Sequence, residues 1–397
     1  MSPMLLHQPI LLARGFKSAG VHCGIKNERP DLAVIYSESP ANAAAVYTQN
    51  AFQAAPIHIT KQHLGNGVAQ AMVINSGNAN ACTGRTGLRD AISMANQTGD
   101  ALGIRPEDVI VSSTGVIGEP LEMDCISRGI NEATKQLHEG GGASVAQAIL
   151  TTDSGIKHAH AELTGGAQLS GIAKGSGMVH PNMATMLGLI VTDVAIPAPV
   201  LQQDLTHAIQ ASFNQISIDG SESTNDMVAI MANGASGQHI RVASPEHEEF
   251  REELLRMCTD LARQIAADGE GATRLMEVSV RGAPNDQIAR SVSRAVARDN
   301  LVKAALHGGD PNWGRILAAA GAAWRELDVD KVQLECKSAR GEAWLFKGGA
   351  PLERPDHLLD ESEISFILDL DSGSAEATAW GSDLSPEYVA FNSEGRT

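Results

Sequence analysis

A glycine-rich stretch that ends directly at a short apolar run constrains this chain most. Residues 174–188 read Lys-Gly-Ser-Gly-Met-Val-His-Pro-Asn-Met-Ala-Thr-Met-Leu-Gly, and Leu-Ile-Val follows at 189–191. A short apolar run beside glycine is typical of a buried strand. We therefore expect a strand over 186–192, with a flexible loop that delivers one small hydroxyl residue, Thr185, to its start.

This layout suits an enzyme that cuts its own backbone and then uses the freed residue as its nucleophile. Gly175 and Gly177 would allow the distorted backbone that hydroxyl attack on its own peptide bond requires. Ala184 offers an unhindered carbonyl, and the strand would hold Thr185 on a rigid element. Taken alone, the segment fits a glycine-rich loop before an ordinary strand equally well.

Six motifs, spread over most of the chain, make the interpretation more specific. They are Gly-Phe-Lys-Ser-Ala-Gly-Val-His-Cys-Gly-Ile at 15–25, Asn-Ser-Gly-Asn-Ala-Asn-Ala-Cys-Thr-Gly at 75–84, Ser-Thr-Gly-Val-Ile-Gly at 113–118, the stretch 171–187, Gly-Glu-Gly-Ala-Thr at 269–273 and Gly-Asp-Pro-Asn-Trp-Gly-Arg at 309–315. In this order they resemble the ornithine acetyltransferase family, the glutamate N-acetyltransferases of arginine biosynthesis. The chain departs from the family at Ser221-Glu222, where Asp-Thr is more usual, and in its tail at 388–393.

The resemblance implies cleavage between Ala184 and Thr185 and a layered αββα sandwich. The pieces 1–184 and 185–397 would build one α/β core together. Sequence periodicity agrees with the α/β class, because strands in blocks between long helices favour layers over strict alternation. The expected strands are 32–36, 44–47, 56–60, 71–74, 108–112, 186–192, 227–231, 275–281, 332–336, 343–346, 364–370, 376–380 and 388–391, and the expected helices are 88–102, 121–138, 143–150, 200–216, 246–267 and 286–305.

A threonine at a new N-terminus can serve as nucleophile and base at once. Its α-amino group has a pKa of about 7.7–8.0, so it can take the proton of its own hydroxyl near neutral pH. The amine exists only after cleavage, so maturation would switch catalysis on. The resemblance implies these roles for Thr185.

The resemblance also implies the other site residues. Thr114 and Gly115, in the Ser-Thr-Gly turn, would form the oxyanion hole that stabilises the charge developing in acyl transfer. The implied substrate-binding residues are Thr151, Lys174, Thr185, Glu270, Asn392 and Thr397. Lys174 would face a carboxylate and Glu270 an ammonium group. Without the resemblance, an isolated lysine or glutamate is usually a solvated surface charge.

The net charge and the cysteine content limit the binding partners and the cellular compartment that we expect for this protein. A formal net charge of −17 repels a phosphate backbone and an anionic membrane, so we expect no nucleic-acid or membrane partner. The five cysteines are scattered and fit reduced thiols in a cytoplasmic protein. The sequence has no apolar stretch of the roughly 20 residues that a membrane span needs. Its N-terminus does not read as a signal peptide.

The sequence predicts no metal and no bound cofactor. Asp219, Glu222 and Asp226 do not follow the order of an EF-hand loop, and His158 and His160 do not follow the zinc motif His-x-x-x-His. The sequence does not decide whether acetyl-CoA is a second acetyl donor.

Three functions are compatible with the sequence. The first is transfer of acetyl from N2-acetylornithine to glutamate through an acetyl-threonine. The second is a self-cleaving amidohydrolase or aminopeptidase with water as acceptor, and the third is an uncleaved small-molecule binding protein. The family further suggests a heterotetramer of two α and two β chains, the two products of cleavage.

Overall fold

The structure, a computed structural model, describes residues 10, 12–180, 186–352 and 354–394. Its larger sheet has eight strands, in the order β4-β3-β2-β9-β7-β6-β5 with β1 beside β2. These strands are β1 (Phe16–Val21), β2 (Leu32–Tyr47), β3 (Val68–Asn78), β4 (Val109–Val116), β5 (Lys157–Glu162), β6 (Gln168–Lys174), β7 (Leu187–Thr192) and β9 (Met227–Ala232).

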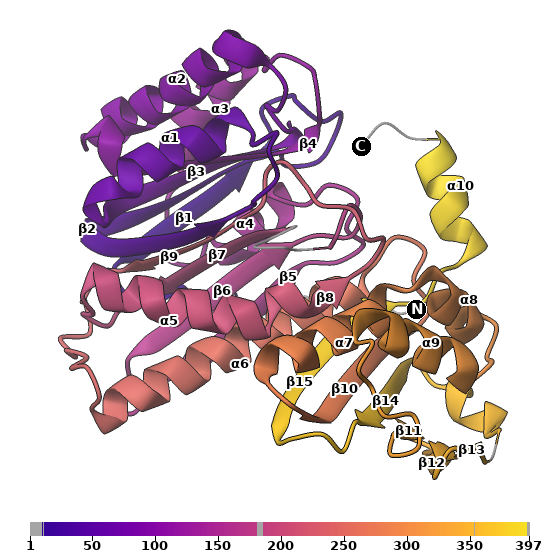
Figure 1. Cartoon of the computed structure of the whole chain (residues 1–397). Helices are drawn as coiled ribbons and strands as arrows, with labels where there is room; N and C mark the ends of the chain where they lie inside the picture. The colour runs from indigo at the N-terminus through magenta and orange to yellow at the C-terminus, as the bar shows by residue number, and fades with distance from the viewer. Residues whose placement is uncertain (1–9, 11, 181–185, 353, 395–397) are drawn as a thin grey trace.

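The long strand β2 divides this sheet into two layers. Its first half pairs with β1 and β3, whereas residues 42–47 pair with β9. Between Tyr36 and Ala41 the register with β3 shifts, an irregularity of the kind that lets a strand bend. Ile35 and Ala45, from the two halves, belong to one buried core. The two sheet layers face each other across that core (Figure 1).

Helices cover the two outer faces. On one side, α1 (Ala55–His63), α2 (Gly84–Leu102) and α3 (Met123–Lys135) pack on β1, β3, β4 and the first half of β2. On the other, α5 (Ala198–Ala211) and α6 (Pro245–Ala267) pack on β5, β6, β7, β9 and the second half of β2. The expected αββα sandwich is confirmed.

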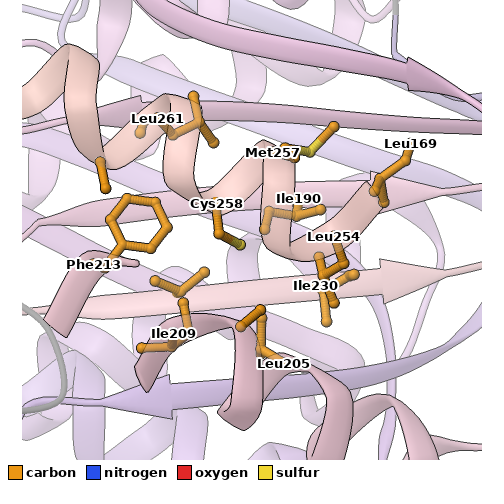
Figure 2. Close-up of a cluster of buried hydrophobic side chains, with 14 of the residues drawn as sticks. Leu169, Ile190, Leu205, Ile209, Phe213, Ile230, Leu254, Met257, Cys258 and Leu261 are labelled. Carbon is orange, nitrogen blue, oxygen red and sulfur yellow. The ribbon is translucent and has the colours of Figure 1, made fainter. Parts of the chain in front are cut away.

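Figure 2 shows the core beneath the second helix layer. Side chains of α6 and α5 meet those of the strands below them, and the labelled residues are Leu169, Ile190, Leu205, Ile209, Phe213, Ile230, Leu254, Met257, Cys258 and Leu261. Apolar residues recur every three or four positions along α6, which explains why one face of this long helix is buried.

A second sheet, formed mostly by the last third of the chain, has its own core. Its order is β13-β12-β11-β14-β10-β15-β8. Its strands are β8 (Ile216–Ser217), β10 (Leu275–Ala283), β11 (Gln333–Ser338), β12 (Gly341–Lys347), β13 (Ala350–Pro351), β14 (Glu363–Asp369) and β15 (Ala375–Ser382). The helices α7 (Asp286–Arg298), α8 (Asn300–His307) and α9 (Trp313–Ala323) cover one face (Figure 1).

Strands from both sides of position 184 form the second sheet layer together. β7 lies between β6, with which it is antiparallel, and β9, with which it is parallel. In the β6–β7 ladder Lys174 is opposite Leu187. This pairing brings the end of β6 next to the chain that directly follows Thr185.

Several expected elements differ from the structure. The predicted strand 56–60 is helix α1, because Pro56 starts a helix and Ala55 and Ile59 share its buried face. The predicted strand 388–391 belongs to helix α10 (Pro386–Glu394), which also begins at a proline. The predicted helix 286–305 is two helices. The Asp299 side chain accepts from the backbone N–H groups of Leu301 and Val302, so it caps α8 as a new helix.

Other elements have no counterpart among those expected. They are β1, β5, β6, β8, β13 and α9. No helix in the described ranges is both long and apolar enough to cross a membrane.

Candidate active site

A cavity of about 370 Å³ brings together six of the predicted site residues. They are Thr114, Gly115, Thr151, Lys174, Glu270 and Asn392. They come from the end of β4, the segment after α4 (Gly142–Ala148), the end of β6, the loop after α6, and α10. Met186 also lines the cavity. Ala184, Thr185 and Thr397 lie outside the described residues.

The Lys174 side chain links two of the predicted groups. Its Nζ donates to Thr151 Oγ1 at 2.6 Å and to Thr114 Oγ1 at 3.4 Å. The residue is only 7% exposed, and burial lowers the pKa of Lys174. Asp153, whose Oδ2 lies 3.9 Å from Nζ, opposes that shift and favours the ammonium. A buried cation therefore lies between two hydroxyl groups of the cavity.

The buried Asp153 carboxylate fixes the groups around Lys174. Its Oδ1 accepts from Lys157 Nζ at 2.7 Å and from the Gly175 N–H at 2.6 Å, and its Oδ2 accepts from the Thr151 N–H at 3.1 Å. Burial alone would raise the pKa of Asp153, but Lys174 and Lys157 outweigh it and hold that pKa below its ordinary value. Asp153 thus stays ionised and fixes the backbone on both sides of the Lys174 ammonium.

A second carboxylate, the half-buried Asp268, extends this group of charges. Lys157 Nζ also lies 2.6 Å from Asp268 Oδ2, and the Ser176 hydroxyl donates to the Asp268 carbonyl at 2.7 Å. Two lysines and two aspartates therefore form one network under the cavity. The sequence reasoning missed Asp153 and Lys157, and their only signal was the Thr-Thr-Asp run at 151–153.

The end of β4 has a conformation that requires glycine. Gly115 has φ +135°, and a Cβ there would lie 2.2 Å from the carbonyl carbon of Gly77. Asn225 fixes the turn, because its Nδ2 donates to the carbonyls of Ser113, at 2.8 Å, and Ala79, at 2.5 Å. Thr114 and Gly115 are therefore held at the cavity wall by close backbone packing.

Glu270 also lines the cavity. It is 8% exposed, and Asn392 Nδ2 donates to its Oε2 at 2.9 Å. A Cβ on Gly177 would lie 2.3 Å from Glu270 Oε1. The structure thus gives Gly177 a role different from the expected backbone distortion. Its φ is not positive, and the missing side chain makes room for the carboxylate.

Asp219 holds the segment that leads to position 181. Its Oδ2 accepts from the Met178 N–H at 2.6 Å, and its Oδ1 from the Val179 N–H at 3.0 Å. Met178 has φ +56°, a conformation that costs a non-glycine residue energy, and the two hydrogen bonds hold it. From the sequence, Asp219 is a candidate only as a metal ligand. Within the ranges that the structure describes, no three His, Cys, Asp or Glu residues gather as a metal site would require.

Lys26 is a further cation at the cavity that sequence reasoning missed. Its Nζ donates to the carbonyls of Pro30, at 2.9 Å, and Leu150, at 2.5 Å. Burial, with the neighbouring Arg29, lowers the pKa of Lys26 to about 8. Lys26 lies directly after the motif at 15–25, which is the one signal that could have pointed to it.

Comparison with known proteins gives a consistent result over nearly the whole chain. A model of the ArgJ family matches residues 17–397. The arginine biosynthesis bifunctional protein ArgJ of Bacillus licheniformis is 46% identical over 395 residues, covering 97% of this chain and 95% of that protein. The protein of the same name from Symbiobacterium thermophilum is 47% identical, covering 96% of this chain and 97% of its own.

Among solved structures, ornithine acetyltransferase from Mycobacterium tuberculosis, complexed with ornithine, is 38% identical. The match has a TM-score of 0.44 and covers 45% of this chain and 98% of that chain.

Proposed function

The chain belongs to the ArgJ family and is an enzyme of arginine biosynthesis, and on this premise we propose its reaction in detail. It cuts its own backbone between Ala184 and Thr185, and then moves the acetyl group of N2-acetylornithine to glutamate through an acetylated Thr185. The observation that carries the proposal is the shared cavity, where Lys174 donates to both Thr114 and Thr151 beside the chain that follows Thr185.

Thr185 supplies the nucleophile. After cleavage its α-amine accepts the proton of its own hydroxyl, and Oγ1 attacks the acetyl carbonyl carbon of N2-acetylornithine. The bond between that carbon and the ornithine nitrogen then breaks, and the nitrogen takes up the proton as ornithine leaves. The product is an acetyl ester on Thr185. The glutamate amine attacks this ester in the second half-reaction, which restores the free threonine.

Thr114 and Gly115 stabilise the oxyanion of both tetrahedral intermediates. The close contact between Gly115 and Gly77 supports this role, since it leaves the turn little freedom to move. The Lys174 ammonium, within 3.4 Å of Thr114 Oγ1, favours negative charge at that side of the cavity. Donors that are fixed beforehand cost no reorganisation when the charge develops.

The amino-acid groups of the substrates find complementary charges in the cavity. Lys174, aided by the Thr151 hydroxyl, faces a carboxylate, and Glu270 faces an ammonium group. Asn392 holds the Glu270 carboxylate through α10, and Thr397 contributes from the same tail. This pair of opposite charges favours an amino acid over water as the acetyl acceptor.

We also propose that the two pieces stay associated after cleavage, because β6 of the first piece pairs with β7 of the second. The ladder runs from Leu169 opposite Thr192 to Lys174 opposite Leu187. Two copies of each piece then form a heterotetramer.

The reaction needs no metal or bound cofactor, since nucleophile, base and hydrogen-bond donors are all protein groups. All five cysteines are free thiols, which fits a cytoplasmic enzyme.

Release of ornithine from N2-acetylornithine, measured with and without glutamate, tests the proposal against the hydrolase alternative. The transferase releases at most one ornithine per site without glutamate, and turns over only when glutamate is added. Continued release without glutamate would identify water as the acceptor.

A further inference from the structure

The acetyl acceptor carries one more charge than the residues assigned above can meet. Glutamate has an amine and two carboxylates. In the proposed reaction Glu270 faces the amine, and Lys174, aided by Thr151, faces one carboxylate. The carboxylate at the end of the side chain has no assigned partner, and a charge that leaves water needs one. A further donor in the cavity is therefore expected.

The acidic residues of the cavity restrict where the second carboxylate of glutamate can lie. Over the described part of the chain, the carboxylates that line the cavity are those of Asp219, Asp226 and Glu270. A carboxylate remains negative when it accepts hydrogen bonds, so all three disfavour a further carboxylate close to them. The cavity is thus not positive throughout, and the second carboxylate of glutamate must lie beside a particular cation.

Two of the cations that line the cavity are already engaged. Within the same described residues, these cations are Lys26, Arg29 and Lys174. Lys26 Nζ donates to three backbone carbonyls, those of Pro30 at 2.9 Å, Ala148 at 3.4 Å and Leu150 at 2.5 Å. These bonds use every N–H of an ammonium group. Lys174 is assigned to the other carboxylate, which leaves Arg29.

The Arg29 guanidinium has donors to spare. Its Nη2 donates to the Thr151 carbonyl at 3.2 Å, and its other N–H groups bond to none of the residues that the structure describes. The side chain is exposed at the cavity, whereas its acidic neighbour Glu28 does not line the cavity. A planar guanidinium can donate two parallel hydrogen bonds to one carboxylate, so Arg29 is equipped to bind an acid.

Thr151 sets the spacing between Arg29 and Lys174. Its carbonyl accepts from Arg29 at 3.2 Å, and its hydroxyl accepts from Lys174 at 2.6 Å, so both cations contact this one residue. The two carboxylate carbons of an extended glutamate are about 5 Å apart, given carbon–carbon bonds of about 1.52 Å. A glutamate with its α-carboxylate at Lys174 can therefore direct its second carboxylate toward Arg29.

We propose that Arg29 binds the side-chain carboxylate of glutamate and so selects an acidic acceptor. This inference rests on the proposed function. N2-acetylornithine has an amine where glutamate has its second carboxylate, so Arg29 pairs with the acceptor and not with the acetyl donor. Its contribution therefore belongs to the second half-reaction.

The ratio kcat/KM, measured separately for each substrate, tests the proposal. When the acetyl group passes through the enzyme, kcat/KM for glutamate reports the second half-reaction and kcat/KM for N2-acetylornithine the first. Arg29→Gln should lower the value for glutamate about 10- to 100-fold, the loss expected for one charge-assisted contact, and change the other value little. Arg29→Lys keeps the charge and should recover part of the loss. Arg85→Gln, at an exposed position of α2 outside the cavity, is the matched control and should match the wild type.

Glutamine as acceptor separates recognition of the charge from damage to the site. It has the shape of glutamate, with a neutral amide in place of the second carboxylate. The wild type should prefer glutamate over glutamine, and Arg29→Gln should lose most of that preference. An equal fall for both acceptors overturns the proposal, as does an unchanged preference.

The mass of the piece that begins at Thr185 distinguishes failure of this inference from failure of the proposed function. If N2-acetylornithine acetylates that piece while Arg29→Gln keeps the preference for glutamate, only the role of Arg29 is refuted. If the acetylated piece never forms, the proposed function is refuted, and this inference with it.

Discussion

The Nζ atom of Lys174 lies 2.6 Å from Oγ1 of Thr151, and both residues line one cavity. Lys174 ends β6, whereas Thr151 follows α4. Asp153 joins them, because it accepts from the Thr151 backbone and lies 3.9 Å from the Lys174 ammonium. The position of the cation therefore depends on a buried carboxylate that substrate does not need to touch.

Asp153→Asn should destabilise the fold by about 3–5 kcal/mol, the usual cost of removing one partner from a buried ion pair. The substitution leaves Lys157 and Lys174 facing a neutral amide in a buried site. Denaturant unfolding at neutral pH measures the loss. Asp328→Asn, at an exposed pair with Lys331, should change stability by less than about 1 kcal/mol. Equal effects of the two substitutions would contradict the role assigned to Asp153.

Stability should also depend on Asp153 through pH. Its folded-state pKa is held below the ordinary value of 3.8, so the folded state favours the ionised form. The resulting stabilisation is complete above the unfolded-state pKa, near pH 4, and is lost as pH falls through the folded-state pKa. Unfolding free energies measured from pH 6 downwards should therefore fall more steeply in the wild type than in Asp153→Asn. Parallel curves would rule out this contribution.

Thr114→Ala should slow acetyl transfer by about 10²–10³ without unfolding the protein, which is the scale of one oxyanion-hole donor. The fold should persist because the turn is fixed by Gly115 and by Asn225, not by the Thr114 hydroxyl. Steady-state rates and circular dichroism check both parts. Thr134→Ala, at a half-buried position of α3 that does not line the cavity, serves as the control. Transfer at the wild-type rate would make Thr114 a turn residue only.

Gly177→Ala should reduce activity about 100-fold, because the added methyl group would lie 2.3 Å from Glu270 Oε1 and displace the carboxylate. Gly155→Ala is the matched control, since a Cβ there meets nothing within 4 Å. KM for glutamate should rise in Gly177→Ala, because the displaced Glu270 carboxylate no longer meets the ammonium group of the acceptor, and should stay unchanged in Gly155→Ala. An unchanged KM in Gly177→Ala would mean that Glu270 does not bind the acceptor.

Cleavage should depend on the hydroxyl at position 185. Thr185→Ala should remain one chain and be inactive, whereas Thr185→Ser keeps a hydroxyl and should still be cut. A denaturing gel distinguishes whole from cleaved chains, and N-terminal sequencing should find Thr185 as the first residue of the second piece. A mature piece that begins at another residue would contradict the cleavage site.

The sequence predicted best where periodicity was strong and long. Helix 246–267 corresponds to α6, and the apolar run after Thr185 corresponds to β7. Short patterns were ambiguous, because the alternation at 56–60 fits a strand as well as the buried face of a short helix. In the structure, these residues form part of helix α1. Strand β6 was missed, since its residues, Gln-Leu-Ser-Gly-Ile-Ala-Lys, mix polar and small side chains although six of its seven are buried.

The site residues were found by family motif rather than by periodicity. Lys174 and Glu270 carry no signal of burial in the sequence, and only the fold makes them wall residues of one cavity. Lys157 was not predicted because its second partner, Asp268, is more than a hundred positions away, and Asp153 was not predicted because its second partner, Lys174, belongs to strand β6. An ion pair between such distant residues leaves no local pattern.

The mass of the piece that begins at Thr185, measured after adding N2-acetylornithine without glutamate, tests the central claim most directly. We expect a shift by one acetyl group on that piece, a burst of up to one ornithine per site, and loss of the shift when glutamate follows. Double-reciprocal plots at several glutamate concentrations should then be parallel. An unmodified piece, together with intersecting plots, would mean direct transfer between two bound substrates and would contradict an acetyl-threonine intermediate.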